Sequence, residues 1–230
     1  MGPTLLSQVY RLHKVKRRRI RWVKQAREDK TAQYARDKGK MIAALKRAKR
    51  DGFRVVYIDE TMFTRSTVPK SEYCLPNQNM TVNQAWINEP TMAVLSGISR
   101  EKGQELFMQF PKSVNGEKFQ EYLEKLRTAN GDAKIALFMD NLSCHKSPES
   151  VKAMRRLKYR WIYNVAYSPD WNPIETTFSK VKHRFRCLRG QVITGALHCS
   201  YEGIINKAFK SLRKKDVVNS VDHVQRLLNL

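Results

Sequence analysis

The chain reads RVVYID at residues 54–59 and KIALFMD at residues 134–140, two apolar runs that each lead into an aspartate. Apolar runs without polar alternation are typical of strands that are covered on both faces of a parallel sheet. If these two strands are parallel neighbours, about 4.8 Å apart, Asp59 and Asp140 lie side by side at the carboxyl edge of the sheet. Ligand sites in open α/β sheets lie at that edge.

A third carboxylate, Glu175, ends the segment YSPDWNPIE at residues 167–175, with 34 residues between Asp140 and Glu175. Adjacent carboxylates repel each other unless a cation neutralises them. Oxygen ligands without a Cys or His set favour Mg²⁺, with Mn²⁺ as a substitute. Two such ions, about 3.5–4 Å apart, can activate the attacking oxygen and stabilise the leaving oxygen in phosphodiester chemistry. The sequence therefore predicts a two-metal catalytic site formed by Asp59, Asp140 and Glu175.

Each of these carboxylates also has a purely structural interpretation. An aspartate after a strand is common turn chemistry, which could account for Asp59 or Asp140 alone. Asn172 as N-cap, Pro173 at the first helical position and Glu175 three residues after the cap would form a capping box. This interpretation is compatible with a metal site, because a helix N-terminus also holds the carboxylate in place.

The composition points to a polyanionic partner. The 230 residues include 44 Lys and Arg against 21 Asp and Glu, which gives a net charge of +23. Such a field attracts nucleic acid first and anionic membranes second, but no apolar run approaches the roughly 18 residues of a membrane-spanning helix. The four cysteines form no C-x-x-C pair, which argues against a zinc ribbon and favours a reducing, intracellular compartment.

Basic residues are concentrated at two places. Residues 1–52 hold 17 Lys and Arg and 4 Asp and Glu. Within this segment, the dense basic run at residues 14–22 can neutralise DNA phosphates or serve as a nuclear localisation signal. The alternative is that these charges are only solvated by water. A second cluster follows Glu175 on a predicted helix and could guide DNA toward the metals. The predicted DNA-binding residues are Lys14, Lys16, Arg17, Arg18, Arg19, Arg21, Lys180, Lys182, Arg184 and Arg186.

The periodicity predicts an α/β fold. We expect strands at 53–58, 92–98, 105–110, 134–139 and 161–165, and helices at 31–50, 116–129, 148–157, 172–188, 201–212 and 216–228. The order β-β-β-α-β-α-β-α predicts a mixed five-stranded sheet flanked by helices. Residues 61–90 fit no element and are interpreted as an irregular insertion. The predicted domains are a basic linker and helical segment (1–52), a catalytic core (53–190) and C-terminal helices that pack on the core (191–230).

Three sequence blocks resemble the signature motifs of the Tc1/mariner (IS630-type) transposases of the DDE superfamily. These blocks are YIDET at 57–61, MDN with His145 at 139–145, and YSPDWNPIE at 167–175, and the 34-residue spacing matches the Asp-Asp-34-Glu class. The resemblance implies an RNase H-like core in which Asp59, Asp140 and Glu175 are the catalytic, metal-binding triad. It also places Asn141, His145 and Asn172 near the site, where His145 could support the site or contact DNA.

The same resemblance implies an activity and partners. We expect Mg²⁺-dependent endonuclease and transposase activity, with cleavage and strand transfer at transposon ends and insertion at TA target DNA by a homodimer in a synaptic complex. The implied location is the nucleus for a eukaryotic element or the cytoplasm for a bacterial one. Family members carry a longer N-terminal helix-turn-helix region, of which residues 6–12 resemble the last helix. A catalytically silent, truncated or domesticated DNA-binding protein is therefore the alternative.

Overall fold

The computed structural model describes residues 12, 28–64, 67, 90–193 and 195–230. Two compact units are present, Met1–Ala35 and Arg36–Leu230. All features discussed below belong to the second unit, apart from the first turns of helix α2 (Glu28–Arg50), which fall within the first unit. The predicted DNA-binding residues of the first basic run lie outside the described residues, as does most of the predicted insertion; these residues are Lys14, Lys16, Arg17, Arg18, Arg19 and Arg21.

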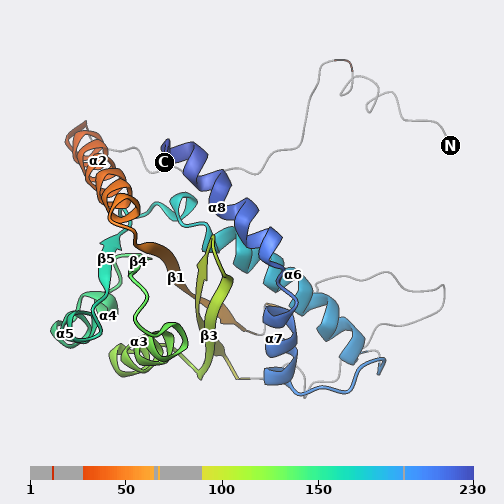
Figure 1. Ribbon diagram of the computed structural model, residues 1–230. Helices are drawn as coiled ribbons and strands as arrows, with labels where there is room; N and C mark the ends of the chain where they lie inside the picture. Colours follow the sequence, from red (N-terminus) through yellow and green to blue (C-terminus); the bar gives the residue numbers. More distant parts are fainter. Residues whose placement is uncertain (1–11, 13–27, 65–66, 68–89, 194) are drawn as a thin grey trace. The chain divides into compact units, whose positions relative to one another are not determined.

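A mixed five-stranded sheet forms the centre of the second unit (Figure 1). Its strands are β1 (Arg54–Phe63), β2 (Met92–Ser99), β3 (Gly103–Pro111), β4 (Ile135–Met139) and β5 (Arg160–Tyr163). Their spatial order is β3-β2-β1-β4-β5. β1 pairs antiparallel with β2 and parallel with β4. This arrangement confirms the predicted sheet and the predicted parallel pairing of the two Asp-containing strands.

β1 is longer than predicted. Its pairing with β4 stops at Tyr57 and Phe138, whereas its pairing with β2 continues from Val56 to Phe63. β2 therefore supplies backbone hydrogen-bond partners beyond the end of β4, and the chain stays extended through Asp59. The prediction that the strand ends at Ile58 is wrong, and residues 61–63 belong to the strand rather than to an insertion.

Helices cover both faces of the sheet. They are α2 (Glu28–Arg50), α3 (Gly116–Asn130), α4 (Ser143–Lys146), α5 (Pro148–Arg156), α6 (Ile174–Ile193), α7 (Tyr201–Lys210) and α8 (Lys214–Leu228), with a 3₁₀ turn, η3, at Pro169–Trp171. Among the described residues, no helix has the length and apolar character needed to cross a membrane. The four-residue helix α4 was not predicted, because a run this short has no detectable periodicity.

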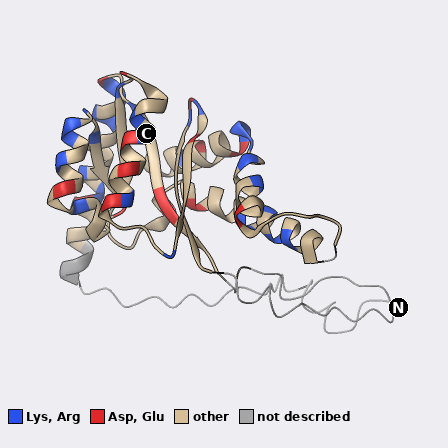
Figure 2. Ribbon diagram, turned by 90° about the horizontal axis from the view of Figure 1, so that it is seen from below, with Lys and Arg blue, Asp and Glu red and all other residues tan. Residues whose placement is uncertain are grey.

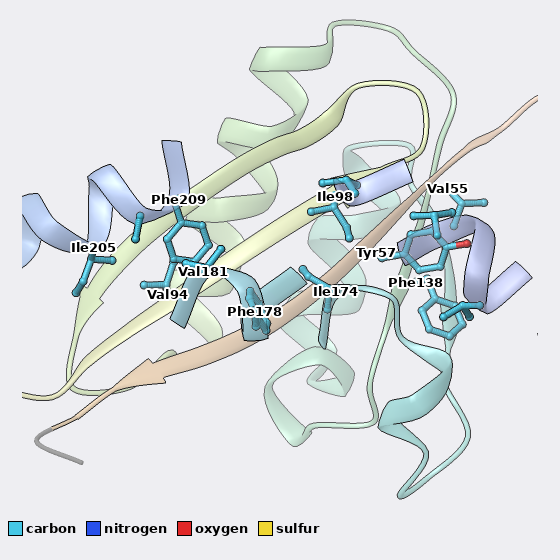
Figure 3. Close-up of a cluster of buried hydrophobic side chains, with 14 of the residues drawn as sticks. Val55, Tyr57, Val94, Ile98, Phe138, Ile174, Phe178, Val181, Ile205 and Phe209 are labelled. Atoms are coloured by element: carbon cyan, nitrogen blue, oxygen red, sulfur yellow. The ribbon is translucent and has the colours of Figure 1, made fainter. Parts of the chain in front are cut away.

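The two faces of the sheet have separate hydrophobic cores. Val55 and Tyr57 of β1 contribute to a core with α6, α7 and α8, whereas Val56 and Ile58 contribute to a core with α3 and α5. This division follows from the alternation of side chains along a strand. Figure 3 shows part of the first core, in which α6 packs on the sheet.

Helix α6 is held firmly against β1. Phe178, Val181 and Phe185 of α6 are buried, and the Phe185 ring lies 4.8 Å from the Phe63 ring between centroids. Burial of such side chains stabilises the fold by about 1.5–3 kcal/mol each. The packing fixes the position of the first turn of α6, which carries Glu175.

Candidate active site

Asp59 and Asp140 project toward the same face of the sheet. The parallel register pairs Tyr57 with Phe138, and their rings lie 5.4 Å apart between centroids on the α6 side. Asp59 lies two residues after Tyr57, and Asp140 lies two residues after Phe138. Because side chains alternate with a period of two, both carboxylates lie on the α6 side at the end of β4.

Glu175 completes a group of three carboxylates. It lies in the first turn of α6, and its side chain is exposed. Asp59, Asp140 and Glu175 line one cavity of about 440 Å³. The rest of the lining comes from Asn141, Leu142, Asn172 and the loop at residues 164–169. The structure thus brings together the three residues that the sequence predicted as a catalytic and metal-binding triad.

Two carboxylates of the cavity, those of Asp59 and Glu175, have raised pKa values. Burial, together with the neighbouring Glu175 and Asp140, raises the pKa of Asp59 to about 7, although a backbone hydrogen bond from Glu60 N–H acts in the opposite direction. The Glu175 carboxylate is accessible to solvent but partly desolvated by the wall of the cavity; this desolvation and Asp140 raise its pKa, whereas Lys182 lowers it. Clustered carboxylates with raised pKa values are characteristic of sites that a cation completes.

Asn172 connects β1 to the start of α6. Its Nδ2 donates hydrogen bonds to Asp59 Oδ2 at 3.0 Å and to the Ile58 carbonyl at 3.4 Å. Its Oδ1 is buried and accepts no hydrogen bond from the described residues. The predicted capping box is therefore wrong, because the Asn172 side chain is directed to the strand and α6 begins at Ile174. The Glu175 carboxylate is left available to the cavity.

These residues fit a hard divalent cation. Three carboxylates contribute oxygen atoms to the lining of one cavity, and the unsatisfied Asn172 Oδ1 is a further oxygen in the same lining. Asp140 Oδ1 accepts a hydrogen bond from Leu142 N–H at 3.2 Å, which restricts the carboxylate. Oxygen-only donor sets of this kind suit Mg²⁺ and Mn²⁺.

His145 lies behind Asp140 and not in the cavity. The ring is fully buried in α4, with Nδ1 2.9 Å from Asp140 Oδ1 and Nε2 3.3 Å from Glu60 Oε1. Burial alone would lower the pKa of His145, but contacts with Asp140, Cys144 and Glu60 outweigh it and raise the pKa to about 12. Of the two predicted roles, support of the site agrees with this burial and direct contact with DNA does not.

Asn141 lines the cavity but is used structurally. Its Nδ2 donates a hydrogen bond to the Asn164 carbonyl. This bond ties the loop after β4 to the loop after β5. The side-chain amide of Asn141 therefore holds two loops together. The residue itself lies close to the site, as predicted.

Lys and Arg occur on several helices (Figure 2), and those of α6 do not all face the site. Lys182 lies near enough to Glu175 to lower the pKa of that carboxyl. The pKa of Lys182 is itself lowered by burial and by the neighbouring Arg186. Lys180 instead forms an ion pair with Asp216 of α8 at 3.2 Å. Arg184 is exposed and lies nine residues after Glu175, which places it about half a turn away around the helix. Two of the four predicted DNA-binding residues of this helix thus lie on the side of the carboxylates.

Sequence reasoning missed Glu60, Asn164 and Tyr167. Glu60 follows Asp59 but faces the opposite side of the sheet, so its contact with His145 depends on the position of α4. Asn164 and Tyr167 shape the loop after β5. Tyr167 belongs to the third motif, which was the only signal for it.

Comparisons with known proteins agree with this geometry. The model of the family described as DDE superfamily endonuclease matches residues 54–191. The structure resembles a Mos1 transposase paired-end complex with the left transposon end, with a TM-score of 0.66 and 20% sequence identity, over 97% of this chain and 68% of that chain. No match was found among curated proteins.

Two further Mos1 structures give similar values. A mariner paired-end complex with Mn has a TM-score of 0.63 and 19% identity, over 97% of this chain and 68% of that chain. The Mos1 catalytic domain has a TM-score of 0.57 and 17% identity, over 90% and 95% of the two chains. The RNase H-like architecture is confirmed by these matches. On the family match, which covers more than half of its residues, this chain belongs to the DDE superfamily of endonucleases, and its fold is similar to that of the Mos1 catalytic domain.

Proposed function

We propose that this chain cleaves DNA at transposon ends and joins the freed ends to target DNA, with Asp59, Asp140 and Glu175 as the catalytic residues. The convergence of the three carboxylates on one cavity carries this proposal. They come from three elements that are distant in sequence, namely β1, the end of β4 and the first turn of α6. A structural role for each residue separately does not account for their meeting.

The same three carboxylates would hold Mg²⁺ or Mn²⁺, and we propose two ions. When bound, such ions would activate the attacking oxygen and stabilise the leaving oxygen of an in-line displacement. The raised pKa values of Asp59 and Glu175 support the need for a cation there. Similar solved structures of Mos1 include complexes with Mg and with Mn.

DNA is the proposed partner. The net charge of +23 and the position of Lys182 and Arg186 beside the carboxylates favour a phosphate backbone at the cavity. Similar solved structures of Mos1 include paired-end and strand-transfer complexes. We further propose that two copies of the chain bind two transposon ends and bring them together. The proposed target sequence is TA, and residues 1–52 are proposed as additional DNA contacts.

The proposal is tested with a substitution at one of the three carboxylates, Asp140. Asp140→Asn should abolish Mg²⁺-dependent cleavage of a duplex with the terminal repeat of the element, whereas DNA binding should survive. Asp132→Asn, at an exposed acid in the loop before β4, is the matched control and should cleave normally. Unchanged cleavage by Asp140→Asn would remove the assignment.

Strand transfer is measured with a pre-cut end, Mg²⁺ or Mn²⁺, and a target duplex that contains TA. Joined products are expected from the unmodified chain. Cleavage without joining would reduce the function to that of a nuclease. Binding without cleavage would instead favour a silent DNA-binding protein.

A further inference from the structure

Tyr167 lies in the lining of the catalytic cavity with its ring free. It is the most exposed large hydrophobic side chain among the described residues, and its side chain is fully accessible. Leu142, which also lines the cavity, is exposed at 40%. An acidic cavity with an uncovered aromatic ring in its lining can offer a flat apolar surface to a ligand. Among the described residues, the Tyr167 side chain has no hydrogen bond, ion pair or ring contact that would explain its presence.

The backbone of Tyr167 is held in an unfavourable conformation. Its φ is +58°, in the left-handed region that residues with a bulky side chain rarely adopt. Turn positions of this kind are normally occupied by Gly or Asn. A tyrosine here makes the turn less stable than a glycine would, so the backbone conformation does not account for the choice of tyrosine at this position.

The surrounding loop enforces this conformation. The buried Asn164 side chain donates a hydrogen bond to the Ser168 carbonyl at 2.7 Å and accepts one from Val165 N–H at 2.8 Å. Asn164 N–H donates to the Met139 carbonyl at 2.8 Å, which anchors the loop to the end of β4. Asp140 follows Met139 directly. The ring of Tyr167 is thus carried by a loop that is fixed relative to a catalytic carboxylate.

We propose that Tyr167 stacks on a nucleobase of the DNA strand that is cut, next to the scissile phosphate. This inference rests on the proposed function and adds a substrate contact to it. A phosphate that reaches the carboxylates brings its flanking bases to the cavity lining, where the free ring offers a face to a base that has left its own stack. Aromatic stacking accepts any base, so this contact positions the strand without reading its sequence.

The experiment compares three substitutions in the cleavage assay. Tyr167→Ala and Tyr167→Gly should reduce cleavage roughly 5- to 150-fold, the loss that corresponds to one base–aromatic stack. Tyr167→Phe keeps the ring and should restore most of the rate. The Tyr167→Gly protein should also unfold at a temperature about 1–4 °C higher, because glycine relieves the left-handed backbone. A drop in cleavage together with a gain in stability separates this role from a structural one.

Lys158 provides the matched control. It has a φ of +55° and an exposed side chain, and it precedes β5, at the end of the sheet opposite the cavity. Lys158→Gly should give a similar gain in thermal stability and leave cleavage unchanged. An equal loss of cleavage in Lys158→Gly would mean that the effect at residue 167 comes from the backbone, and would overturn the inference.

Abasic substrates identify the contact directly. An abasic site, placed in turn on each side of the scissile phosphate, removes one possible stacking base. At one position, the difference between the tyrosine and Tyr167→Ala proteins should disappear. If Tyr167→Ala is impaired equally on every substrate, or if Tyr167→Phe is as slow as Tyr167→Ala, stacking is refuted. Failure of the unmodified chain to cleave any substrate would instead refute the proposed function.

Discussion

Asp59 shows how folding brings a carboxylate into an environment that disfavours its charge. The side chain is half-buried beside Asp140 and Glu175, and its pKa is raised from 3.8 to about 7. Between these two values, the folded metal-free protein holds a proton that the unfolded chain has released. The free energy of unfolding therefore falls as the pH rises through this window.

A substitution isolates this contribution. Asp59→Asn removes the titrating group, so the metal-free variant should exceed the unmodified chain in stability by an amount that grows between pH 4 and pH 7 and then levels off. A difference of about 1–3 kcal/mol is expected at pH 8, less than the full shift because the site is partly solvated. Urea denaturation at several pH values with a chelator present measures it. Identical pH profiles for the two proteins would contradict the raised pKa.

His145 acts on the site through Asp140. Its ring bridges Asp140 and Glu60 across the sheet and packs against Phe119 with the ring centroids 4.5 Å apart. Outer partners of metal ligands commonly contribute 10- to 100-fold to metal affinity or activity, so about this loss is expected for His145→Asn. The Mg²⁺ concentration for half-maximal cleavage should rise, with DNA affinity unchanged.

Glu60 provides the test of this connection. If Glu60 acts only by holding His145, Glu60→Gln should add little to the defect of His145→Asn, and the double variant should be non-additive. His223→Asn, at an exposed histidine on α8, is the control and should cleave normally. Additive effects of Glu60→Gln and His145→Asn would show that the two residues act independently.

At the scale of elements, the first turn of α6 depends on its bond to β1. Asn172→Ala removes the hydrogen bonds to Asp59 and to the Ile58 carbonyl. The expected loss is about 1–2 kcal/mol of stability together with reduced cleavage, because Glu175 loses its fixed distance from Asp59.

Asn115→Ala is the comparison for this prediction. Asn115 caps α3 by accepting a hydrogen bond from Lys118 N–H, away from the cavity. It should lose about 1 kcal/mol of stability with cleavage unchanged. Thermal unfolding and cleavage rates of both variants measure the effect. A similar cleavage rate for Asn172→Ala and Asn115→Ala would show that Asn172 contributes only stability.

The elements differ in how far the sequence predicts them. β4 and the central part of β1 are apolar on both faces, and helices such as α3 have buried residues at helical spacing, so local patterns suffice. The extension of β1 through Phe63 depends on β2, which lies far along the chain. The direction of the Asn172 side chain likewise depends on β1. Sequence patterns predicted that Asn172 caps α6 because such patterns consider only neighbouring residues and not the hydrogen bonds to β1.

At the scale of the whole molecule, the charge should dominate DNA affinity. Each phosphate neutralised contributes a slope of about 0.9 to the dependence of log affinity on log salt concentration. Replacing Lys182 and Arg186 with Gln should weaken binding and reduce this slope by about 2. Lys180→Gln is the control on the same helix, and it should change the slope less, because Lys180 is paired with Asp216. Fluorescence anisotropy with metal-free protein measures all three slopes.

The alternation of side chains along β1 and β4 sets a limit on how the gene can vary. Apolar residues in these strands can be exchanged for others of similar volume, because packing of the two cores depends on side-chain volume more than on chemical identity. Deletion of one codon within residues 54–58 or 135–139 would turn Asp59 or Asp140 to the α3 side of the sheet. The turn at residues 100–102 is exposed and positions no carboxylate of the cavity, so a deletion there would not change which side of the sheet Asp59 and Asp140 face. Indel tolerance should therefore be lowest where substitution tolerance is high.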